Sequence, residues 1–311
     1  VSVLKQNNPN EDIINMKKIV SFSGGRTSAY LCKVMIDTFG RENVDFVYMD
    51  TGAEHRKTYE FIKKVNNQFQ LNLICLRGDF TKPLGDGVGY NVVDINSLKP
   101  DLKPFKSMMS KYGVPYIGGM FCTDRMKLKP FKKYCDDKYG KNNYETWLGI
   151  REDEPKRLNL KPLIKYMAEI SDFDKQDVLN WWESIKFKHY KICKFKNKKT
   201  IKVFYHVKFD LDLNEWSGNC EFCPKKSNLK LAASAKDEPE SYKRFLLAMS
   251  DSSVRVDNNT GHRSKMYRGK QSLESLVATF DGATGDEIKA RIKGGKQLDT
   301  NSCAESCEVF N

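Results

Sequence analysis

A short segment near the start of the chain combines glycines, hydroxyls and an arginine in a pattern that can hold a phosphate. Glycine lets the backbone turn closely toward a ligand, and backbone N–H groups at the start of a helix attract an anion. Serine and threonine hydroxyls can donate further hydrogen bonds to phosphate oxygens. The alternative is a glycine-rich turn that binds nothing, but the place of the segment between a predicted strand and a predicted helix favours the phosphate site. Its residues are Ser23, Gly24, Gly25, Arg26, Thr27 and Ser28.

A second polar segment follows the next predicted strand and includes Asp50, Thr51, Gly52 and Glu54. The carboxyl ends of parallel strands lie at one edge of a sheet, so we expect this segment to face the same ligand. Asp50 and Glu54 can bind ribose hydroxyls or a metal ion such as Mg²⁺. A turn formed by Asp-Thr-Gly with a solvated glutamate is the other interpretation. His55 lies beside a basic run and is more typical of a surface residue.

Three arginines and a lysine supply candidate anion contacts beyond these two segments. Arg151 follows a predicted strand, and its planar guanidinium suits bidentate binding of phosphate or sulfate, so we take it as the catalytic anion clamp. Arg157 lies in the same charged run, for which a solvated group of ion pairs is the alternative. Arg125 and Lys127 can serve the same anion, and surface charge at a helix start is an equal competitor for these two.

Nine cysteines include two close pairs, a spacing that lets thiolates share a metal ion. Cys220 and Cys223 form a C-x-x-C motif, and Cys303 and Cys307 form a looser C-x-x-x-C. Reduced thiols or metal ligands are favoured over disulfides, because the sequence carries no export signal. Four further cysteines fall in predicted helices or strands and are expected to be packing residues: Cys32, Cys75, Cys135 and Cys193.

The apolar pattern predicts strands and helices in alternation. Strands are expected over 18–22, 44–49, 71–76 and 144–150, and helices over about 29–39, 57–69, 127–139 and 175–185. This order indicates an α/β fold with a Rossmann-like parallel sheet flanked by helices. Residues 77–120 contain several glycines and prolines and little periodicity, so a long loop is expected there.

The chain divides into three predicted parts. Residues 1–186 form the nucleotide-binding α/β domain, 187–209 an inserted basic hairpin, and 210–311 a smaller, mostly helical part that carries the cysteine pairs. The stretch Lys186–Lys208 is lysine-rich with interleaved aromatic residues, a composition that can contact nucleic acid. A solvated hairpin whose aromatic residues pack on the domain is the competing interpretation. Helices are expected over 229–235, 238–249 and 272–279, followed by a tail rich in glycine and lysine.

Composition narrows the class of protein. The 311 residues are 40% hydrophobic and 30% charged, which argues against a disordered chain, a collagen-like repeat and a membrane protein. Lysine and arginine total 53 against 40 aspartates and glutamates, and the net charge of +13 favours anionic partners. With no apolar span or signal peptide, we expect a cytoplasmic protein without a membrane partner. The oligomeric state stays open.

Six segments, taken in order, resemble the PP-loop (adenine nucleotide alpha hydrolase-like) superfamily and, within it, the phosphoadenosine phosphosulfate (PAPS) reductase-like family, which has many phage and bacterial members. They are residues 23–28, 50–58, 122–127, 148–157, 218–227 and 303–307. The resemblance implies an adenine nucleotide, PAPS or ATP, across the carboxyl ends of the strands, with its phosphate or sulfate end at residues 23–28. ATP-cleaving members commonly have an aspartate where this chain has Thr27, which counts against ATP hydrolysis.

The resemblance also gives the cysteines possible roles, since Cys122 matches a cluster cysteine of iron–sulfur sulfonucleotide reductases. One reading is a [4Fe–4S] cluster on Cys122, Cys220, Cys223 and one tail cysteine. A second is a zinc site of Cys220, Cys223, Cys303 and Cys307. In a third, Cys303 or Cys307 attacks the sulfur of the sulfonucleotide as a thiolate, although the Glu-Cys-Gly-x-His tail of PAPS reductases is absent. Unligated thiols are the remaining interpretation.

Three functions follow from these features. The favoured one is a PAPS reductase-like oxidoreductase or sulfotransferase that transfers or reduces an activated sulfur group, with a thiol reductant protein as electron donor. The second is an adenylylating ATP pyrophosphatase that thiolates a nucleic acid, favoured by the basic hairpin and the net charge. The third is a non-catalytic nucleotide or nucleic-acid binder with structural zinc, favoured by Thr27.

Overall fold

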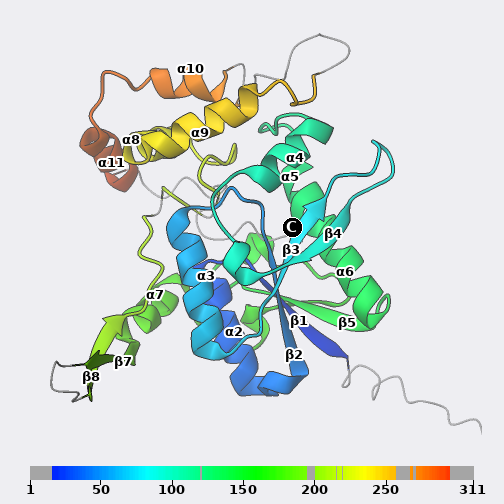
Figure 1. The fold of residues 1–311 in the computed structure, drawn as a ribbon, viewed down its shortest axis with the longest axis vertical. Coiled ribbons are helices and arrows are strands. Elements are labelled where there is room, and N and C mark those ends of the chain that lie inside the picture. Colours follow the sequence, from blue (N-terminus) through cyan, green and yellow to red (C-terminus); the bar gives the residue numbers. More distant parts are fainter. Residues whose placement is uncertain are drawn as a thin grey trace, which may run out of the picture.

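The computed structural model describes residues 16–119, 121–194, 200–214, 216–218, 220–256, 267–268 and 271–294. Within them a six-stranded sheet has the strand order β4-β3-β2-β1-β5-β6 (Figure 1). Its strands are β1 (Lys17–Phe22), β2 (Val44–Met49), β3 (Ile74–Asp79), β4 (Gly89–Val93), β5 (Tyr144–Leu148) and β6 (Ile164–Tyr166). Neighbouring strands run parallel except β4, which is antiparallel to β3. The predicted Rossmann-like α/β fold is confirmed, with an antiparallel edge strand that the pattern did not predict.

Helices account for most of the remaining described residues. The α-helices are α2 (Arg26–Phe39), α3 (Arg56–Phe69), α4 (Lys103–Tyr112), α5 (Phe121–Thr123), α6 (Lys129–Tyr139), α7 (Lys175–Ser184), α8 (Asn228–Asp237), α9 (Pro239–Ser250), α10 (Leu273–Ala278) and α11 (Gly285–Gly294). Short 3₁₀ or π turns are η1 (Arg41–Asn43), η2 (Ile95–Ser97), η3 (Asp124–Leu128), η4 (Pro155–Arg157) and η5 (Met167–Glu169). None of these helices has both the length and the apolar character that a bilayer crossing needs.

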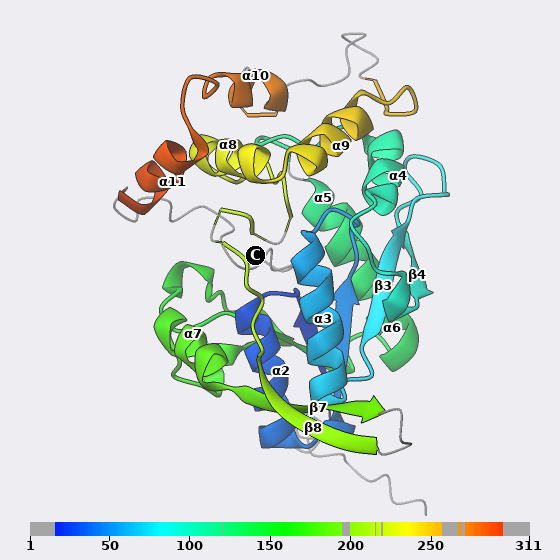
Figure 2. The same ribbon diagram turned by 60° about the vertical axis from the view of Figure 1, so that its left-hand side comes forward.

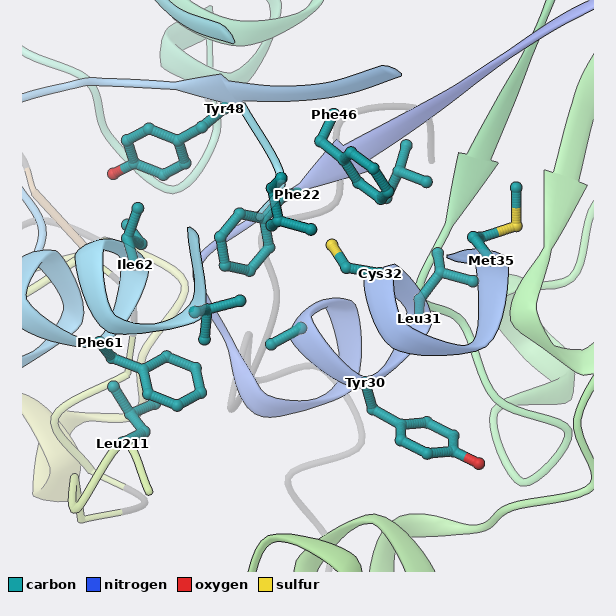
Figure 3. Close-up of a cluster of buried hydrophobic side chains, with 14 of the residues drawn as sticks. Phe22, Tyr30, Leu31, Cys32, Met35, Phe46, Tyr48, Phe61, Ile62 and Leu211 are labelled. Carbon is teal, nitrogen blue, oxygen red and sulfur yellow. The ribbon is translucent and has the colours of Figure 1, made fainter. Parts of the chain in front are cut away.

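Successive strand residues point to opposite faces of the sheet, and helices cover both faces. Val20 of β1 and Phe46 of β2 lie in one core with residues of α2 and α3. Their neighbours Ile19 and Val47 lie in a second core, on the side of α6. Figure 2 shows α2 and α3 on one side of the strands and α6 on the other. In Figure 3 the Cys32 side chain of α2 lies among the rings of the first core.

A helical layer formed by α8, α9, α10 and α11 lies beyond the carboxyl ends of the strands (Figures 1 and 2). It shares a buried core with segments that follow the strands. Leu102 and Met126 from the first part of the chain lie in that core with Phe222, Leu231 and Phe245. This shared core positions the segment that carries the C-x-x-C motif next to the strand ends.

The predicted hairpin is confirmed as an antiparallel pair of strands, β7 (Lys186–Lys194) and β8 (Thr200–Lys208), which form a sheet of their own. In both views it lies at the end of the molecule away from the α8 to α11 layer (Figures 1 and 2). The division of the chain into three domains stays a prediction.

The expectation of a structureless loop over 77–120 is wrong, since β4, η2 and α4 lie there. The glycines that suggested a loop, Gly85 and Gly87, do lie between strands. Pro104, however, occupies the first turn of α4, where proline is tolerated. Phe105, Met108 and Met109 then form the buried side of that helix. Their spacing is helical, and the prolines and glycines around it obscured the signal.

Two further boundaries differ from the prediction. The third strand begins at Ile74 instead of Leu71, because Gln70 and Asn72 have positive φ angles of 52° and 47°. Leu71 between them is fully buried, so its apolar character reflects packing after α3 and not strand pairing. The tail expected after residue 279 contains α11, whose single buried residue, Ile288, left little periodicity to detect.

Gly52 lies where the start of α4 closes over the segment that follows β2. Its φ is +71°, and a Cβ there would lie 2.7 Å from Pro104 Cδ, while its carbonyl accepts a 3.0 Å hydrogen bond from the Leu102 N–H. We expect Gly52→Ala to lower the free energy of unfolding by about 3 kcal/mol, from strain plus the clash. Gly85→Ala is the matched control, because its φ is +106° with no atom within 4 Å. Urea denaturation should show the smaller loss for Gly85→Ala, and equal losses would contradict the packing role.

Candidate functional site

The loop after β1 is held by hydrogen bonds among its own residues. The Ser23 N–H donates to Ser28 Oγ at 3.2 Å, the two serine hydroxyls are 2.8 Å apart, and Ser28 Oγ donates to the Gly25 carbonyl at 3.1 Å. Gly24 has a φ of +84°, a conformation that favours glycine. Gly25 precedes α2, and no side-chain hydrogen bond caps that helix in the described part of the chain. The loop therefore has the preformed shape and helix start that suit an anion.

Arg151 reaches this loop from the neighbouring strand. It follows β5, which pairs with β1, and the strand order reverses at this point because β2 lies on the other side of β1. Arg151 Nη1 donates to Thr27 Oγ1 at 3.0 Å. The Arg151 side chain is almost fully buried, and its Nε and Nη2 donate to the two oxygens of Asp153 at 2.7 and 3.2 Å. The structure thus brings together the two predicted anion contacts at the switch point of the sheet.

Arg157 is paired within the charged run that also contains Arg151. Its Nη1 makes a short ion pair with Glu154 Oε1. The other oxygen of Glu154 accepts from the Arg151 backbone N–H at 3.3 Å and is 3.6 Å from Arg151 Nη1. Part of the charged run is therefore paired internally, as expected if the run is only a group of ion pairs. Anion binding by Arg157 stays a prediction.

The Arg26 side chain is paired with a segment far along the chain. Its Nε and Nη2 donate to Asp210 at 2.6 and 2.9 Å, and its carbonyl accepts from Trp182 Nε1 at 3.1 Å. Both partners follow much later in the chain, so they join the start of α2 to α7 and to the segment after β8. A phosphate contact by the Arg26 side chain stays a prediction.

Asp50 is fully buried and surrounded by donors. Its Oδ1 accepts from the Gly52 N–H at 3.0 Å and the Tyr59 hydroxyl at 2.8 Å, and its Oδ2 accepts from Arg77 Nε at 2.6 Å. These contacts match the turn-forming interpretation of Asp50. The local sequence pattern did not predict Tyr59 and Arg77 as partners of Asp50. Arg77 lies within β3, opposite Asn91 of β4.

Glu54 is buried at the junction of three segments. Its Oε2 accepts from Thr51 Oγ1 at 2.7 Å and from the Tyr59 hydroxyl at 2.8 Å. Its Oε1 faces Lys127 Nζ at 3.8 Å and Cys220 Sγ at 3.9 Å. Burial raises the pKa of the Glu54 carboxyl above its usual value, and the Lys127 charge offsets part of this increase. The competing interpretation, a solvated glutamate, is therefore wrong, and nucleotide or metal binding by Glu54 stays a prediction.

The predicted cation pair after Cys122 is split by the π turn η3. Lys127 is buried beside Glu54. Arg125 instead lies with its guanidinium 5.0 Å from the Tyr112 ring centroid and its Nε 3.3 Å from Asp124 Oδ2. A π turn rotates successive side chains relative to an α-helix, and such turns are frequent at functional sites. Of the two cations, Lys127 is thus the one next to the segment that follows β2.

His55 is buried, so the expectation of a surface residue is wrong. Its Nδ1 accepts from the Lys57 N–H at 3.1 Å and caps α3. Its Nε2 is 3.0 Å from Glu238 Oε1 at the start of α9. The histidine thus links α3 to the helical layer, a contact with a residue 183 positions away that no local pattern reveals.

The C-x-x-C segment is attached directly to the segment after β2. Cys220 pairs with Glu54 in an antiparallel bridge, and the Glu221 N–H donates to the Ala53 carbonyl at 3.0 Å. Arg268 holds the other side of the turn, since its Nη1 donates to the carbonyls of Pro224 at 3.1 Å and Lys226 at 2.8 Å. Two backbone contacts and one arginine therefore fix the cysteines next to Glu54.

Tyr267 is buried within electrostatic range of three cysteines. Burial raises the pKa of the Tyr267 phenol well above its usual value, and the charges of Cys223, Cys122 and Cys220 raise it further. The donor types suit a thiolate-bound cluster or zinc. Within the described ranges, however, no three Cys, His, Asp or Glu side chains are close enough to hold a metal ion. The predicted fourth ligands, Cys303 and Cys307, lie outside those ranges.

The packing role predicted for the other cysteines is confirmed for Cys32, Cys75 and Cys135, which are buried in the cores on the two faces of the sheet. Burial raises the pKa of all three thiols, that of Cys75 to about 12, so they are poor nucleophiles. The prediction for Cys193 lies outside the described side chains.

Lys226 lies fully buried within the turn that carries Cys220 and Cys223. Its Nζ donates to the carbonyls of Ser217 at 2.5 Å and Glu221 at 2.7 Å, and burial lowers its pKa to about 8. We expect Lys226→Met to lower the free energy of unfolding by about 2 kcal/mol, since two buried carbonyls lose their donor. Lys225→Met, at the half-buried neighbouring position, should change it by less than about 0.5 kcal/mol. Similar urea midpoints for both variants would contradict this role.

The chain is similar in sequence or in fold to several known proteins. A family model described as the phosphoadenosine phosphosulfate reductase domain matches residues 17–82. The uncharacterized nin region protein ORF290 of Escherichia phage lambda is 42% identical over 299 residues, which cover 95% of this chain and 96% of that protein. The uncharacterized protein MJ0066 of Methanocaldococcus jannaschii is 25% identical over 136 residues, 44% of this chain and 23% of that protein. A crystal structure of PAPS reductase from Candida auris, in a phosphate complex, is 15% identical with a TM-score of 0.34, covering 58% of this chain and 80% of that chain.

The lambda protein matches nearly the full length of the chain, and the reductase-domain match covers β1 to β3, including the loop after β1 and the segment after β2. The chain therefore belongs to the same family as the lambda protein ORF290, a family of the PAPS reductase-like, PP-loop type.

Proposed function

We propose that this protein is a PAPS reductase-like enzyme that binds an adenine nucleotide at residues 23–28 and transfers or reduces its activated sulfur group. The observation that carries the proposal is the contact between the cysteine turn and the strand ends. Cys220 Sγ is 3.9 Å from Glu54 Oε1, in the segment directly after β2. Redox-capable thiols are thus next to the edge of the sheet at which an α/β fold binds its ligand.

The anionic end of the nucleotide is assigned to the loop after β1 and to Arg151. Backbone N–H groups at the start of α2 donate to phosphate or sulfate oxygens, and the Arg151 guanidinium supplies charge next to Thr27. The buried Lys127 adds a second cation near the cysteine turn. Asp50 and Glu54 then shape the site through hydrogen bonds to Tyr59, and neither is required as a Mg²⁺ ligand.

The sulfur chemistry is assigned to a tail thiolate, Cys303 or Cys307. The thiolate attacks the sulfur of PAPS, an S–S bond forms, the S–O bond breaks, and the adenosine bisphosphate leaves with the electron pair. A second thiol attacks the cysteine sulfur, which forms a disulfide and releases sulfite. A thiol reductant protein supplies two electrons to restore the dithiol. The cysteine sulfurs are oxidised and the sulfonyl sulfur is reduced, so the electrons balance.

Cys122, Cys220, Cys223 and one tail cysteine are the proposed ligands of a [4Fe–4S] cluster, with zinc on Cys220, Cys223 and the tail pair as the alternative. An iron–sulfur cluster supplies a redox-active centre beside the nucleotide, whereas zinc supplies a structural cross-link. Support comes from the C-x-x-C spacing of Cys220 and Cys223 and from the place of Cys220 beside Glu54 at the strand ends. Anaerobic purification with iron, zinc and sulfide analysis decides between the two, and Cys32→Ser, in the buried core of the sheet, is the control for cysteine replacement in general.

The activity test uses the full chain under anaerobic conditions with PAPS and a thiol donor. We expect sulfite release that Cys307→Ser or Cys303→Ser abolishes while PAPS binding persists. ATP is the second arm, tested with and without nucleic acid. The proposal would be wrong if PAPS yields no sulfite and ATP releases pyrophosphate only when nucleic acid is present. That result would indicate an enzyme that uses ATP to thiolate a nucleic acid. Binding without any product would favour the non-catalytic binder.

Two partners belong to the same proposal. One is the thiol reductant protein, and the other is a nucleic acid at the lysine-rich residues 186–208, whose predicted hairpin backbone is present. The phage origin of the lambda relative supports action in the cytoplasm of an infected bacterium.

A further inference from the structure

Two fully buried hydroxyls next to the proposed nucleotide site have no hydrogen-bond partner in the described part of the chain. They belong to Tyr48 on β2 and Thr58 in the first turn of α3. Their residues are 1% and 0% exposed, so bulk water does not reach them. Tyr59, one residue after Thr58, is equally buried, yet its hydroxyl lies 2.8 Å from carboxylates on both Asp50 and Glu54.

An unpaired buried hydroxyl costs folding free energy, so its retention needs an explanation. Phenylalanine in place of Tyr48, or valine in place of Thr58, would keep the shape and avoid that cost. A threonine inside a helix usually donates to the carbonyl one turn back. Thr58 makes no such bond, although its backbone N–H donates to the His55 carbonyl at 2.9 Å. Both hydroxyls are thus available to a group other than the protein.

Both residues adjoin the phosphate loop. A Cβ on Gly24 would lie 3.0 Å from Thr58 Cγ2 and 2.9 Å from Ile62 Cδ1, so the turn rests directly on the first turns of α3. The Tyr48 side chain lies beside Ile62 in the core between β2 and α3, with its hydroxyl pointing past Ile62 (Figure 3). The Thr58 methyl group and the Ile62 side chain thus support the turn that is expected to hold the anionic end of the ligand, and the Tyr48 side chain lies against the same Ile62.

The surrounding charges indicate what kind of group these donors suit. Burial raises the pKa of the Tyr48 phenol well above its usual value, and the nearby carboxylates of Glu54 and Asp50 raise it further, so the phenol keeps its proton. The same carboxylates repel an anion. An uncharged group with an acceptor atom, such as a ring nitrogen of adenine or a ribose hydroxyl, fits this environment, whereas sulfate or phosphate fits the side of Arg151.

We infer that Tyr48 and Thr58 are specificity residues that donate hydrogen bonds to the nucleoside part of the nucleotide and so set its direction across the sheet. This inference rests on the proposed function, because it needs an adenine nucleotide at residues 23–28. Both hydroxyls are covered in the structure. Binding therefore requires a shift of the Ile62 side chain or of the Gly24 turn that exposes them.

The test compares Tyr48→Phe and Thr58→Val with the wild type by calorimetry, with PAPS, ATP, adenosine and inorganic pyrophosphate as probes. Each variant should weaken binding of the three adenosine-containing probes about tenfold, and pyrophosphate binding should not change. The melting temperature should stay the same or rise, because each variant removes an unpaired buried hydroxyl. The matched control is Tyr59→Phe, whose hydroxyl is paired in the structure, and it should lower the melting temperature.

Two results would overturn the inference and remain distinguishable from each other. If both variants lower the melting temperature as Tyr59→Phe does and leave all affinities unchanged, the hydroxyls serve a buried water molecule. In that case the wild type still binds nucleotide and the proposed function stands. If the wild type binds none of the nucleotides, the proposed function is wrong, and the inference, which depends on it, is wrong as well.

Discussion

Replacing Arg151 with methionine is expected to weaken PAPS binding about 100-fold, the loss of roughly two charge-assisted hydrogen bonds. Arg151 contacts the loop of residues 23–28 through a 3.0 Å hydrogen bond from Nη1 to Thr27 Oγ1. Its side chain is 7% exposed, so little water screens its charge. Arg151→Lys keeps the positive charge but loses the two parallel donors of the guanidinium. It should therefore retain only part of the PAPS affinity that Arg151→Met loses. Isothermal titration calorimetry measures the PAPS affinity of the wild type and of both variants.

Asp153→Asn is expected to change the PAPS affinity in the opposite direction from Arg151→Met. The Asp153 carboxylate accepts from two nitrogens of the Arg151 guanidinium, at 2.7 and 3.2 Å, and so competes with the ligand for that fork. Removing its charge should tighten PAPS binding severalfold. If Asp153→Asn weakens PAPS binding as much as Arg151→Met does, the Arg151–Asp153 ion pair acts as a unit that shapes the loop. The assignment of Arg151 as the anion-binding residue would then be wrong.

Replacing Arg77 with methionine is expected to lower the free energy of unfolding by about 3 kcal/mol, because it leaves a buried carboxylate without its cation. The Asp50 side chain is 0% exposed and only 2.6 Å from Arg77 Nε. Tyr59 and the Gly52 N–H continue to donate to Asp50, but neither carries a positive charge. Urea denaturation followed by circular dichroism measures the loss.

The double variant Asp50→Asn with Arg77→Met tests the cause of that loss. Once the carboxylate charge is removed, the missing cation costs less, so the double variant should lose less stability than the sum of the single variants. Glu60→Gln, in the exposed Arg56–Glu60 pair, should change the free energy of unfolding by less than about 0.5 kcal/mol. Additive losses at Asp50 and Arg77 would show that the pair contributes nothing as a pair.

The order of the elements around the site is visible in the sequence because buried parallel strands are continuous apolar runs. The runs at 18–22 and 44–49 lie inside β1 and β2, and the polar segments after them lie at the strand ends. The rule that ligands bind where strand order reverses then predicts that the loop after β1 and the segment after β5 meet. The hydrogen bond between Thr27 and Arg151 is consistent with that prediction.

Long-range partners could not be predicted in the same way. Asp50 reads equally well as a ligand contact and as a turn residue, and its partner Arg77 lies 27 positions later. His55 and Glu54 look like surface residues because the α8 to α11 layer and the cysteine turn that bury them come more than 150 positions later. Burial by a distant segment leaves no local periodicity.

The central claim is that the nucleotide and the cysteine turn form one site. The most direct test is the rate at which N-ethylmaleimide alkylates Cys122 and Cys220 in the full chain, measured by mass spectrometry with and without PAPS. Both residues are partly exposed, so we expect both to react once any bound metal has been removed with a chelator. Saturating PAPS is expected to slow alkylation of both cysteines, and Arg151→Met is expected to raise the PAPS concentration that this protection needs. Unchanged alkylation rates while calorimetry shows PAPS bound would contradict a shared site.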